Sequence, residues 1–117
     1  MATMEEKVLS GSTNGLGITL DDVNTGGAVT IHTAVAGTSN IDKIWLYATN
    51  TGASAVKLTI EWGETDINGN IEVTLDGEAG LILVVPGLPL RNGLLVKAFA
   101  GTADVISIHG FVHRITA

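Results

Sequence analysis

The stretch Asp104–Ile115, with the sequence DVISIHGFVHRI, alternates like a β-strand but carries apolar side chains on both faces. One face holds Ile106, Ile108 and Val112, and the other holds Val105, Phe111 and Ile115, with His109 and His113 between them. A strand with one face on a core and the other in water should have a polar second face. The sequence therefore predicts that both sides of this strand are covered, either by more of the same chain or by another chain.

The composition describes one domain that carries little charge. The chain has 117 residues and a mass of 12.1 kDa, and a domain of this size buries about two-thirds of its unfolded surface. Charged residues make up 15% of the chain and its mean hydropathy is +0.39, whereas ordinary soluble domains are about 25% charged. A soluble chain of this kind is expected to bury surface in an oligomer or assembly.

The same composition argues against several classes of function. The chain has no cysteine, which removes disulfides, thiolate chemistry and cysteine zinc sites. A net charge of −6 with scattered basic residues argues against nucleic-acid binding. No apolar run approaches the roughly 20 residues of a membrane helix, and the start of the chain has glutamates where a signal peptide has positive charge. We therefore expect neither nucleic acid nor membrane among its partners.

The chain is predicted to be all-β. Short alternating or apolar segments are separated by turns rich in glycine, asparagine and aspartate, and no long segment has helical periodicity. The predicted strands are Gly17–Leu20, Ala28–Ala34, Ile41–Thr49, Ala55–Trp62, Asn70–Leu75, Leu81–Val85, Leu94–Ala100 and Asp104–Ile115. Fifteen glycines and short, regularly spaced strands favour an antiparallel, jelly-roll-like sandwich or barrel of about eight strands.

The N-terminal part is predicted to differ from this domain. Residues 1–16 are polar and punctuated by glycine around Val8 and Leu9, which is typical of a flexible arm unless a neighbour holds it. We therefore divide the chain into an extended arm over residues 1–16 and a single β-sandwich domain over residues 17–117. Val8 and Leu9 are the side chains through which the arm is predicted to contact a neighbouring subunit or the larger assembly to which the protein belongs.

Two strands carry informative face patterns. In Ile41–Thr49 the alternation turns Ile44, Leu46 and Ala48 inward, and it leaves two large aromatic side chains facing outward. Leu81–Val85 is apolar on both faces, which predicts a central strand covered on each side. The prolines that follow it are predicted to end it.

The three histidines are the main metal or acid–base candidates. His109 and His113 lie four apart on one strand, so their Cα atoms are about 13 Å apart and they cannot share a metal ion within one chain. They could meet symmetry copies at an oligomer axis, but we favour a role at a subunit interface or in solvent. His32 lies in an alternating strand and is predicted to be a hydrogen-bonded sheet residue. We predict no metal site and no cofactor.

The sequence contains no recognisable catalytic site. Ser107 and His109 share a strand face with Asp104 nearby, but nothing resembles a nucleophile elbow. The carboxylate pairs Glu5–Glu6 and Asp21–Asp22 fall in arm or loop sequence, where a role in solubility is more typical. We predict that the protein is not an enzyme.

Trp45 and Tyr47 support a binding hypothesis. An outward aromatic pair with Asn50 and Asp42 nearby could stack a sugar ring. The same pair could instead pack on a neighbouring subunit or under a loop, and we favour this second reading.

The segments IDKIWLYATNTGASAVKLTIEWG and VVPGLPLRNGLLVKAFAGTADVISIHGFVHRIT resemble the small β proteins that tailed bacteriophages encode near their capsid genes. These are called head decoration, cement or capsid-stabilising proteins. The resemblance covers Ile41–Thr116. It lies in the strand–turn pattern, the loop containing Pro-Gly before the penultimate strand, and the final Gly-Thr-Ala-Asp to His-Gly-Phe-Val-His-Arg-Ile sequence.

The resemblance implies a jelly-roll or related sandwich that trimerises and sits on the outer surface of the virion head. Proteins of this family clamp adjoining units of the major capsid protein against the pressure of packaged DNA. The chain would be made in the host cytoplasm and carried on the virion. We expect His109, Phe111, His113 and Ile115 to lie at the subunit interface of a homotrimer.

Two alternatives remain from the sequence. One is a carbohydrate-binding β-sandwich displayed on a virion, with Trp45 and Tyr47 as its aromatic platform. The other is a tail or neck structural protein of the same kind of virus.

Overall fold

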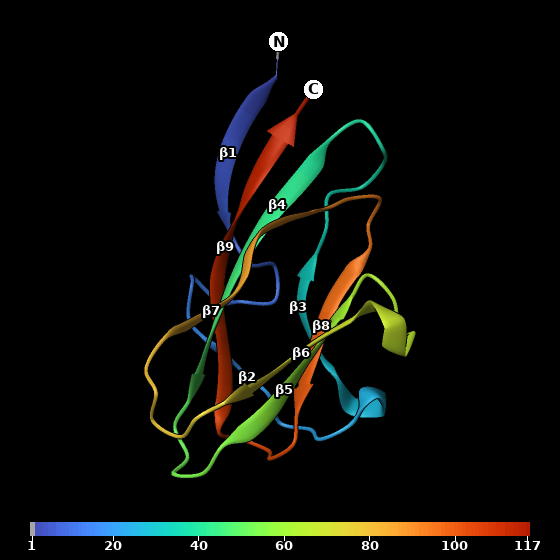
Figure 1. Cartoon of the computed structure of the whole chain (residues 1–117). Helices are drawn as coiled ribbons and strands as arrows, with labels where there is room; N and C mark the ends of the chain where they lie inside the picture. The colour runs from blue at the N-terminus through green and yellow to red at the C-terminus, as the bar shows by residue number, and fades with distance from the viewer. Residues whose placement is uncertain (1) are drawn as a thin grey trace.

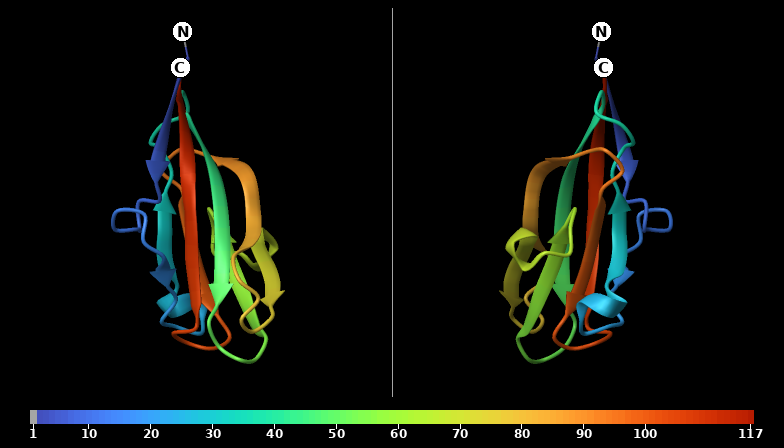
Figure 2. Two further views of the ribbon diagram at one scale, coloured as in Figure 1. Left: turned by 90° about the vertical axis from the view of Figure 1, so that its left-hand side faces the viewer. Right: turned by 90° about the vertical axis from the view of Figure 1, so that its right-hand side faces the viewer.

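Nine strands in residues 2–117, the part of the chain that the computed structural model describes, form two antiparallel sheets packed face to face (Figure 1, Figure 2). Sheet A has the order β1-β9-β4-β7, with β2 also paired to β9, and sheet B has the order β3-β8-β5-β6. The strands are Thr3–Val8 (β1), Ile18–Thr19 (β2), Val29–Thr33 (β3), Ile41–Asn50 (β4), Val56–Trp62 (β5), Asn70–Leu75 (β6), Ile82–Leu90 (β7), Leu95–Ala100 (β8) and Ile106–Thr116 (β9). Two short 3-10 turns are Thr25–Gly27 (η1) and Ile67–Gly69 (η2).

The strand pairing is that of a jelly roll. β2 pairs with β9, β3 with β8, β4 with β7 and β5 with β6, all antiparallel, so the two halves of the chain run beside each other like one long hairpin. Pairing of β4 with β9 and of β5 with β8 then joins this ribbon into two sheets. The predicted all-β antiparallel sandwich is confirmed, and its eight predicted strands correspond to β2–β9.

The inward faces of the two sheets form one hydrophobic core. β9 supplies Ile106, Ile108 and Val112, and β4 supplies Ile44 and Leu46, all fully buried. The two residues of β4 are among those predicted to point inward, and in β9 the core takes the face that holds Ile106, Ile108 and Val112. Each such side chain contributes about 1.5–3 kcal/mol by leaving water, which makes this core the main stabilising term of the fold.

The N-terminal segment differs from the predicted free arm. Thr3–Val8 form an edge strand that pairs with the last part of β9, and Figure 1 shows β1 lying along β9 beside the C-terminus. Leu9 is buried in the core, whereas Val8 is half exposed. The side chains of β1 are mostly exposed, so its attachment comes from backbone pairing, which leaves no apolar pattern in the sequence. Met1 lies outside the described residues.

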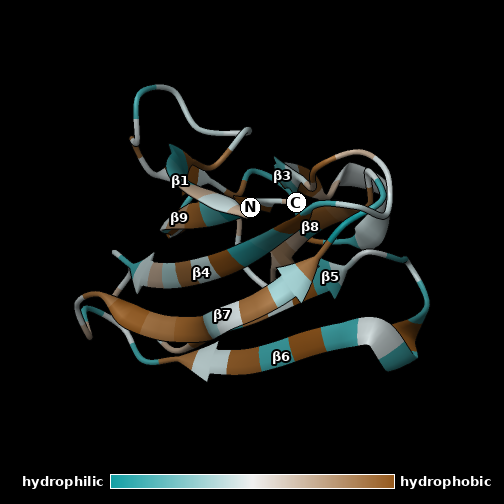
Figure 3. Cartoon of the chain, turned by 90° about the horizontal axis from the view of Figure 1, so that it is seen from above, coloured by the Kyte–Doolittle hydropathy of each residue, from teal (hydrophilic) through white to brown (hydrophobic). Residues whose placement is uncertain are grey.

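Strand β7 also differs from the prediction. It is an edge strand of sheet A rather than a central one, and it continues through Pro86 and Pro89. An edge tolerates proline because its outward backbone position needs no N–H donor. Leu83 of β7 and Leu81, which precedes the strand, are 48% and 57% exposed, so the strand is not covered on both sides. Figure 3 shows β7 next to β6 at one side of the sandwich, with much of β7 coloured as hydrophobic.

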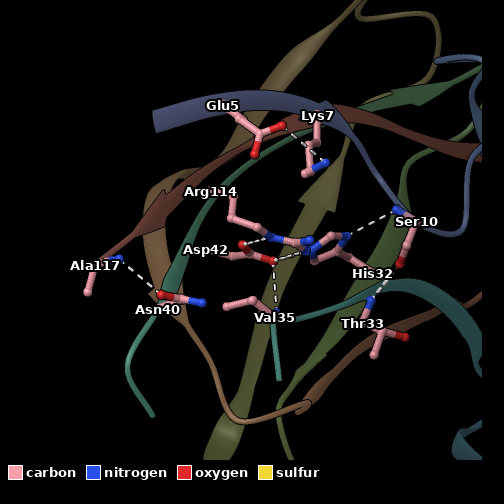
Figure 4. Close-up of polar contacts among 10 residues, drawn as sticks. All are labelled: Glu5, Lys7, Ser10, His32, Thr33, Val35, Asn40, Asp42, Arg114 and Ala117. Carbon is pink, nitrogen blue, oxygen red and sulfur yellow. Dashed lines mark hydrogen bonds and ion pairs between the residues drawn. The ribbon is translucent and has the colours of Figure 1, made fainter. Parts of the chain in front are cut away.

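A buried cluster of polar groups ties the N-terminal segment to both sheets (Figure 4). Asp42 of β4 is fully buried and accepts hydrogen bonds from Arg114 Nε at 2.8 Å and Nη2 at 3.0 Å. It also accepts the backbone N–H of Val35 at 3.0 Å, and its Oδ2 lies 2.8 Å from His32 Nε2. The backbone N–H of Ser10 donates to His32 Nδ1 at 3.0 Å. Because Nδ1 accepts, the ring proton is assigned to Nε2, which donates to Asp42.

This arrangement confirms His32 as a hydrogen-bonded sheet residue and sets the charge of Asp42. Burial alone would raise the pKa of Asp42, but the hydrogen bonds from Arg114 and His32 and the charge of Arg114 lower it more, so it lies below its ordinary value of 3.8. The hydrogen bond to Asp42 in turn raises the pKa of Arg114. Because the folded-state pKa of Asp42 is below the unfolded one, its contribution is present above about pH 4 and is lost as pH falls through the folded pKa.

We predict that Asp42→Asn lowers the free energy of unfolding by about 3 kcal/mol near neutral pH, because Arg114 loses its carboxylate partner in a largely buried site. Urea unfolding monitored by circular dichroism measures this. The difference from the unsubstituted protein should shrink below about pH 4. Glu72→Gln is the matched control, since it removes an exposed ion pair with Lys57 and should cost less than about 1 kcal/mol. Equal losses in the two variants would contradict this account.

Candidate interaction surface

The outer face of sheet A carries aromatic and apolar side chains where a water-facing sheet normally carries polar ones. The strand register places these side chains in rows across β1, β9, β4 and β7. The rows are Met4–Ile115–Ile41, Glu6–His113–Lys43–Pro89, Val8–Phe111–Trp45–Pro86 and His109–Tyr47–Leu83. We call this set of residues the aromatic face. Apart from its histidines, only Glu6 and Lys43 within it are acidic or basic residues, so the face offers a largely apolar surface.

The residues predicted for three different contacts gather on this one face. They are His109, Phe111, His113 and Ile115 from the predicted subunit interface, Trp45 and Tyr47 from the predicted aromatic contact, and Val8 from the predicted arm. Leu9 is the exception, because it is buried in the core and is not available to a partner. Met4, Leu83 and the prolines of β7 complete the face and were missed by sequence reasoning. The apolar second face of β7 was the signal that could have placed Leu83 there.

The centre of the aromatic face is a packed ring cluster. The rings of Trp45 and Phe111 stack with centroids 5.0 Å apart and planes 10° apart. The His113 ring lies 4.7 Å from the Trp45 ring and 5.3 Å from the Phe111 ring, and its Nε2 lies 3.2 Å from Glu6 Oε1. These contacts fix the rings before any partner binds, which lowers the entropy cost of association.

Gly87 of β7 allows the indole of Trp45 to lie close to the backbone of the neighbouring strand. Its φ is +82°, and a Cβ at this position would lie 2.8 Å from the Trp45 ring. A side chain here would therefore meet both an unfavourable backbone conformation and the indole.

The outer face of sheet B is different in character. It carries Lys57 and Glu72, which form an ion pair at 3.0 Å, together with the exposed side chains of Thr74 and Thr30. This is the polar pattern expected of a sheet that faces water. The contrast between the two sheets singles out the aromatic face of sheet A as the candidate interaction surface.

The described residues show where the catalytic and metal candidates lie. In residues 2–117 no group of three or more histidine, aspartate or glutamate side chains is arranged to hold a metal ion. Ser107 pairs its hydroxyl with that of Thr19 at 3.0 Å, and the ring of His109 lies against the backbone of Gly17. Both ring nitrogens of the buried His32 are engaged within the protein. No helix among these residues has the length and apolar character needed to cross a membrane.

Comparisons with known proteins were made on sequence and on structure. Neither the models of protein families nor the curated proteins include a match to this chain. A solved structure of Bacillus endospore appendages, a family of disulfide-linked pili, is 14% identical with a TM-score of 0.49, over 99% of this chain and 88% of that one. The Eiger TNF of S. frugiperda is 11% identical with a TM-score of 0.40, over 97% and 92%. Likenesses this distant carry no argument about function.

We predict that Gly87→Ala destabilises the protein by about 2 kcal/mol more than Gly37→Ala. Both glycines have positive φ, +82° and +77°, but a Cβ at position 37 would have open space around it. The control therefore reports backbone strain alone, about 1 kcal/mol, and the excess at position 87 reports overpacking against Trp45. Urea unfolding and the near-ultraviolet circular dichroism of the indole measure the two effects. Equal destabilisation with unchanged spectra would show that Trp45 does not pack on Gly87.

Proposed function

We propose that this chain is a structural virion protein of a tailed bacteriophage that decorates the outer surface of the head and stabilises the shell of the major capsid protein. The observation that carries the proposal is the aromatic face, a preformed and largely apolar surface on sheet A. The resemblance of Ile41–Thr116 to head decoration proteins supplies the location and the expected homotrimer. The role is structural, without a cofactor or a catalytic step.

Self-association through the aromatic face is the core of this proposal. Trp45 is of a residue type that dominates the binding energy of protein interfaces. Phe111, which stacks on it at the centre of the patch, is of a type enriched in interface cores. Val8 in the same row is 50% exposed, and Leu83 in the next row is 48% exposed. Their burial against a second copy would remove apolar area from water. A second copy bound in this way would bury the outer face of β9, which the sequence predicts to be covered.

We assign contact with the capsid to the edge of sheet A that is formed by β1. β1 takes the place of the predicted free arm, since it is an edge strand with one side of its backbone open to pairing. Val8 can take part in such a contact, whereas Leu9 cannot. An edge strand of this kind adds to a neighbouring sheet without any change in the fold of the sandwich.

A carbohydrate-binding module is the second candidate function. Trp45 and Tyr47 both lie on the outer face of sheet A, where aromatic surface can stack on a sugar ring. A tail or neck location would use the aromatic face in the same way as the head location, with a different viral partner.

We predict that Phe111→Asp converts a stable oligomer to a monomer. A charge in the centre of the aromatic face would have to be desolvated on association, so the apparent dissociation constant should rise by at least about 100-fold. Multi-angle light scattering at micromolar concentration measures the mass against the subunit mass of 12.1 kDa. Thr74→Asp, an exposed substitution on sheet B, should leave the oligomer unchanged. An unsubstituted protein that is monomeric in this experiment would overturn self-association.

We further predict that the purified protein adds stoichiometrically to phage capsids that lack their decoration protein, and that it raises their melting temperature. Co-sedimentation and differential scanning calorimetry measure this, with Thr74→Asp as the control that should still bind. Trp45→Ala tested on a glycan array separates the rival function. Specific glycan binding that this variant abolishes, together with no addition to capsids, would favour the carbohydrate-binding module instead.

A further inference from the structure

A cavity of about 260 Å³ lies at one end of sheet B, apart from the aromatic face. It is built by two segments, the end of β5 with its following turn and the start of β8, which are joined by a 2.9 Å hydrogen bond from the Gly63 N–H to the Leu95 carbonyl. The side chains that line it are Glu61, Glu64, Thr65, Leu94, Leu95 and Lys97. Its walls therefore combine two leucines with a few charged and polar groups.

Glu61 is the unusual member of this set. Its side chain is only 2% exposed although it lies on the outer side of the sheet. Oε2 accepts a hydrogen bond from the hydroxyl of Thr25 in η1 at 2.6 Å, but Oε1 is buried and has no hydrogen-bond partner among the described residues. Lys97 lies directly across from Glu61 on β8, yet it does not donate to Oε1. A buried carboxylate oxygen without a donor is costly.

A second buried acceptor lies on the neighbouring strand. Asn70 of β6 is the register partner of Glu61, and its Oδ1 also lacks a partner. Asn70 does not line the cavity, so Glu61 is the acceptor that the cavity offers. A carboxylate oxygen matches a group that carries N–H donors and a positive charge. Leu94 and Leu95, 43% and 38% exposed at the cavity, offer apolar contact to a carbon chain attached to that group.

We propose that this cavity binds a primary ammonium or guanidinium group on an apolar stem, with Glu61 Oε1 as its charged acceptor and the two leucines against its stem. Such a group can come from a free small amine or from a lysine or arginine side chain of an adjoining protein. The inference stands independently of the virion role, because it rests on Glu61 and the cavity rather than on the aromatic face.

The test uses n-butylammonium and n-butylguanidinium as probes and n-butanol as the uncharged control, titrated into the ¹⁵N-labelled full chain. We expect saturable shifts in the amide resonances of Gly63, Thr65 and Leu95 with the two cations and not with butanol. Glu61→Gln keeps the size of the side chain but removes its charge, so it should weaken binding at least about tenfold. Glu64→Gln is the matched control, since this residue lines the same cavity but is exposed, and it should change the affinity less than about twofold.

The same variants distinguish the two sources of the cation. If the natural occupant is a side chain of a neighbouring copy, Glu61→Gln also weakens self-association in light scattering, and butylammonium competes with it. If the occupant is a free amine, the oligomer is unaffected. The proposal is overturned if the cations cause no localised shifts, if butanol causes the same shifts, or if folded Glu61→Gln binds as well as the unsubstituted protein. Those results would show that Glu61 is satisfied internally, for example by the Asn70 amide turned to donate.

Discussion

The antiparallel pairing of β4 with β9 determines the composition of both faces of sheet A. It runs without interruption from Ile41 opposite Ile115 to Asn50 opposite Ile106. A shift by one residue would exchange the two faces of a strand, so this register alone decides which side chains enter the core. Asp42 and Arg114 are register partners on the inward side. If β9 shifted relative to β4, Asp42 would be buried without the guanidinium of Arg114. A buried unpaired carboxylate is costly, so this ion pair destabilises shifted registers relative to the observed one.

Much of this arrangement could be predicted from alternation along single strands. The pattern of Ile41–Thr49 identified the inward residues and the outward aromatics correctly, because this strand has one face in the core. The pattern of Asp104–Ile115 separated its two faces but did not say which one enters the core. The same patterns predicted contact residues on two separate segments. The structure adds that these segments are neighbours, so that the residues form one surface. Residue spacing within a strand carries no information on which strands are adjacent.

The parts that could not be predicted depend on long-range contacts. β1 attaches by backbone pairing to a strand about a hundred residues away, and β7 lies at an edge although its sequence resembles a central strand. Glu61 occupies a polar position in an alternating strand, yet it is buried and bonded to Thr25, which is 36 residues away in the sequence. An apolar second face on a strand therefore indicates that both faces are buried in the functional state, but it does not say whether the same chain buries them. The outer faces of β7 and β9 are only partly buried by the described residues, which leads to the proposal of a partner.

Hydroxyl-radical footprinting across a concentration series tests the central claim, that a second copy covers the aromatic face. Trp45, Tyr47 and Phe111 should lose reactivity together as the protein associates, because their rings become buried. Phe99 on the outer side of sheet B is an internal reference of the same residue type as Phe111 and should stay as reactive as in the dilute protein. Protection of Phe99 with unchanged Trp45 and Phe111 would place the interface on the other sheet and contradict the account.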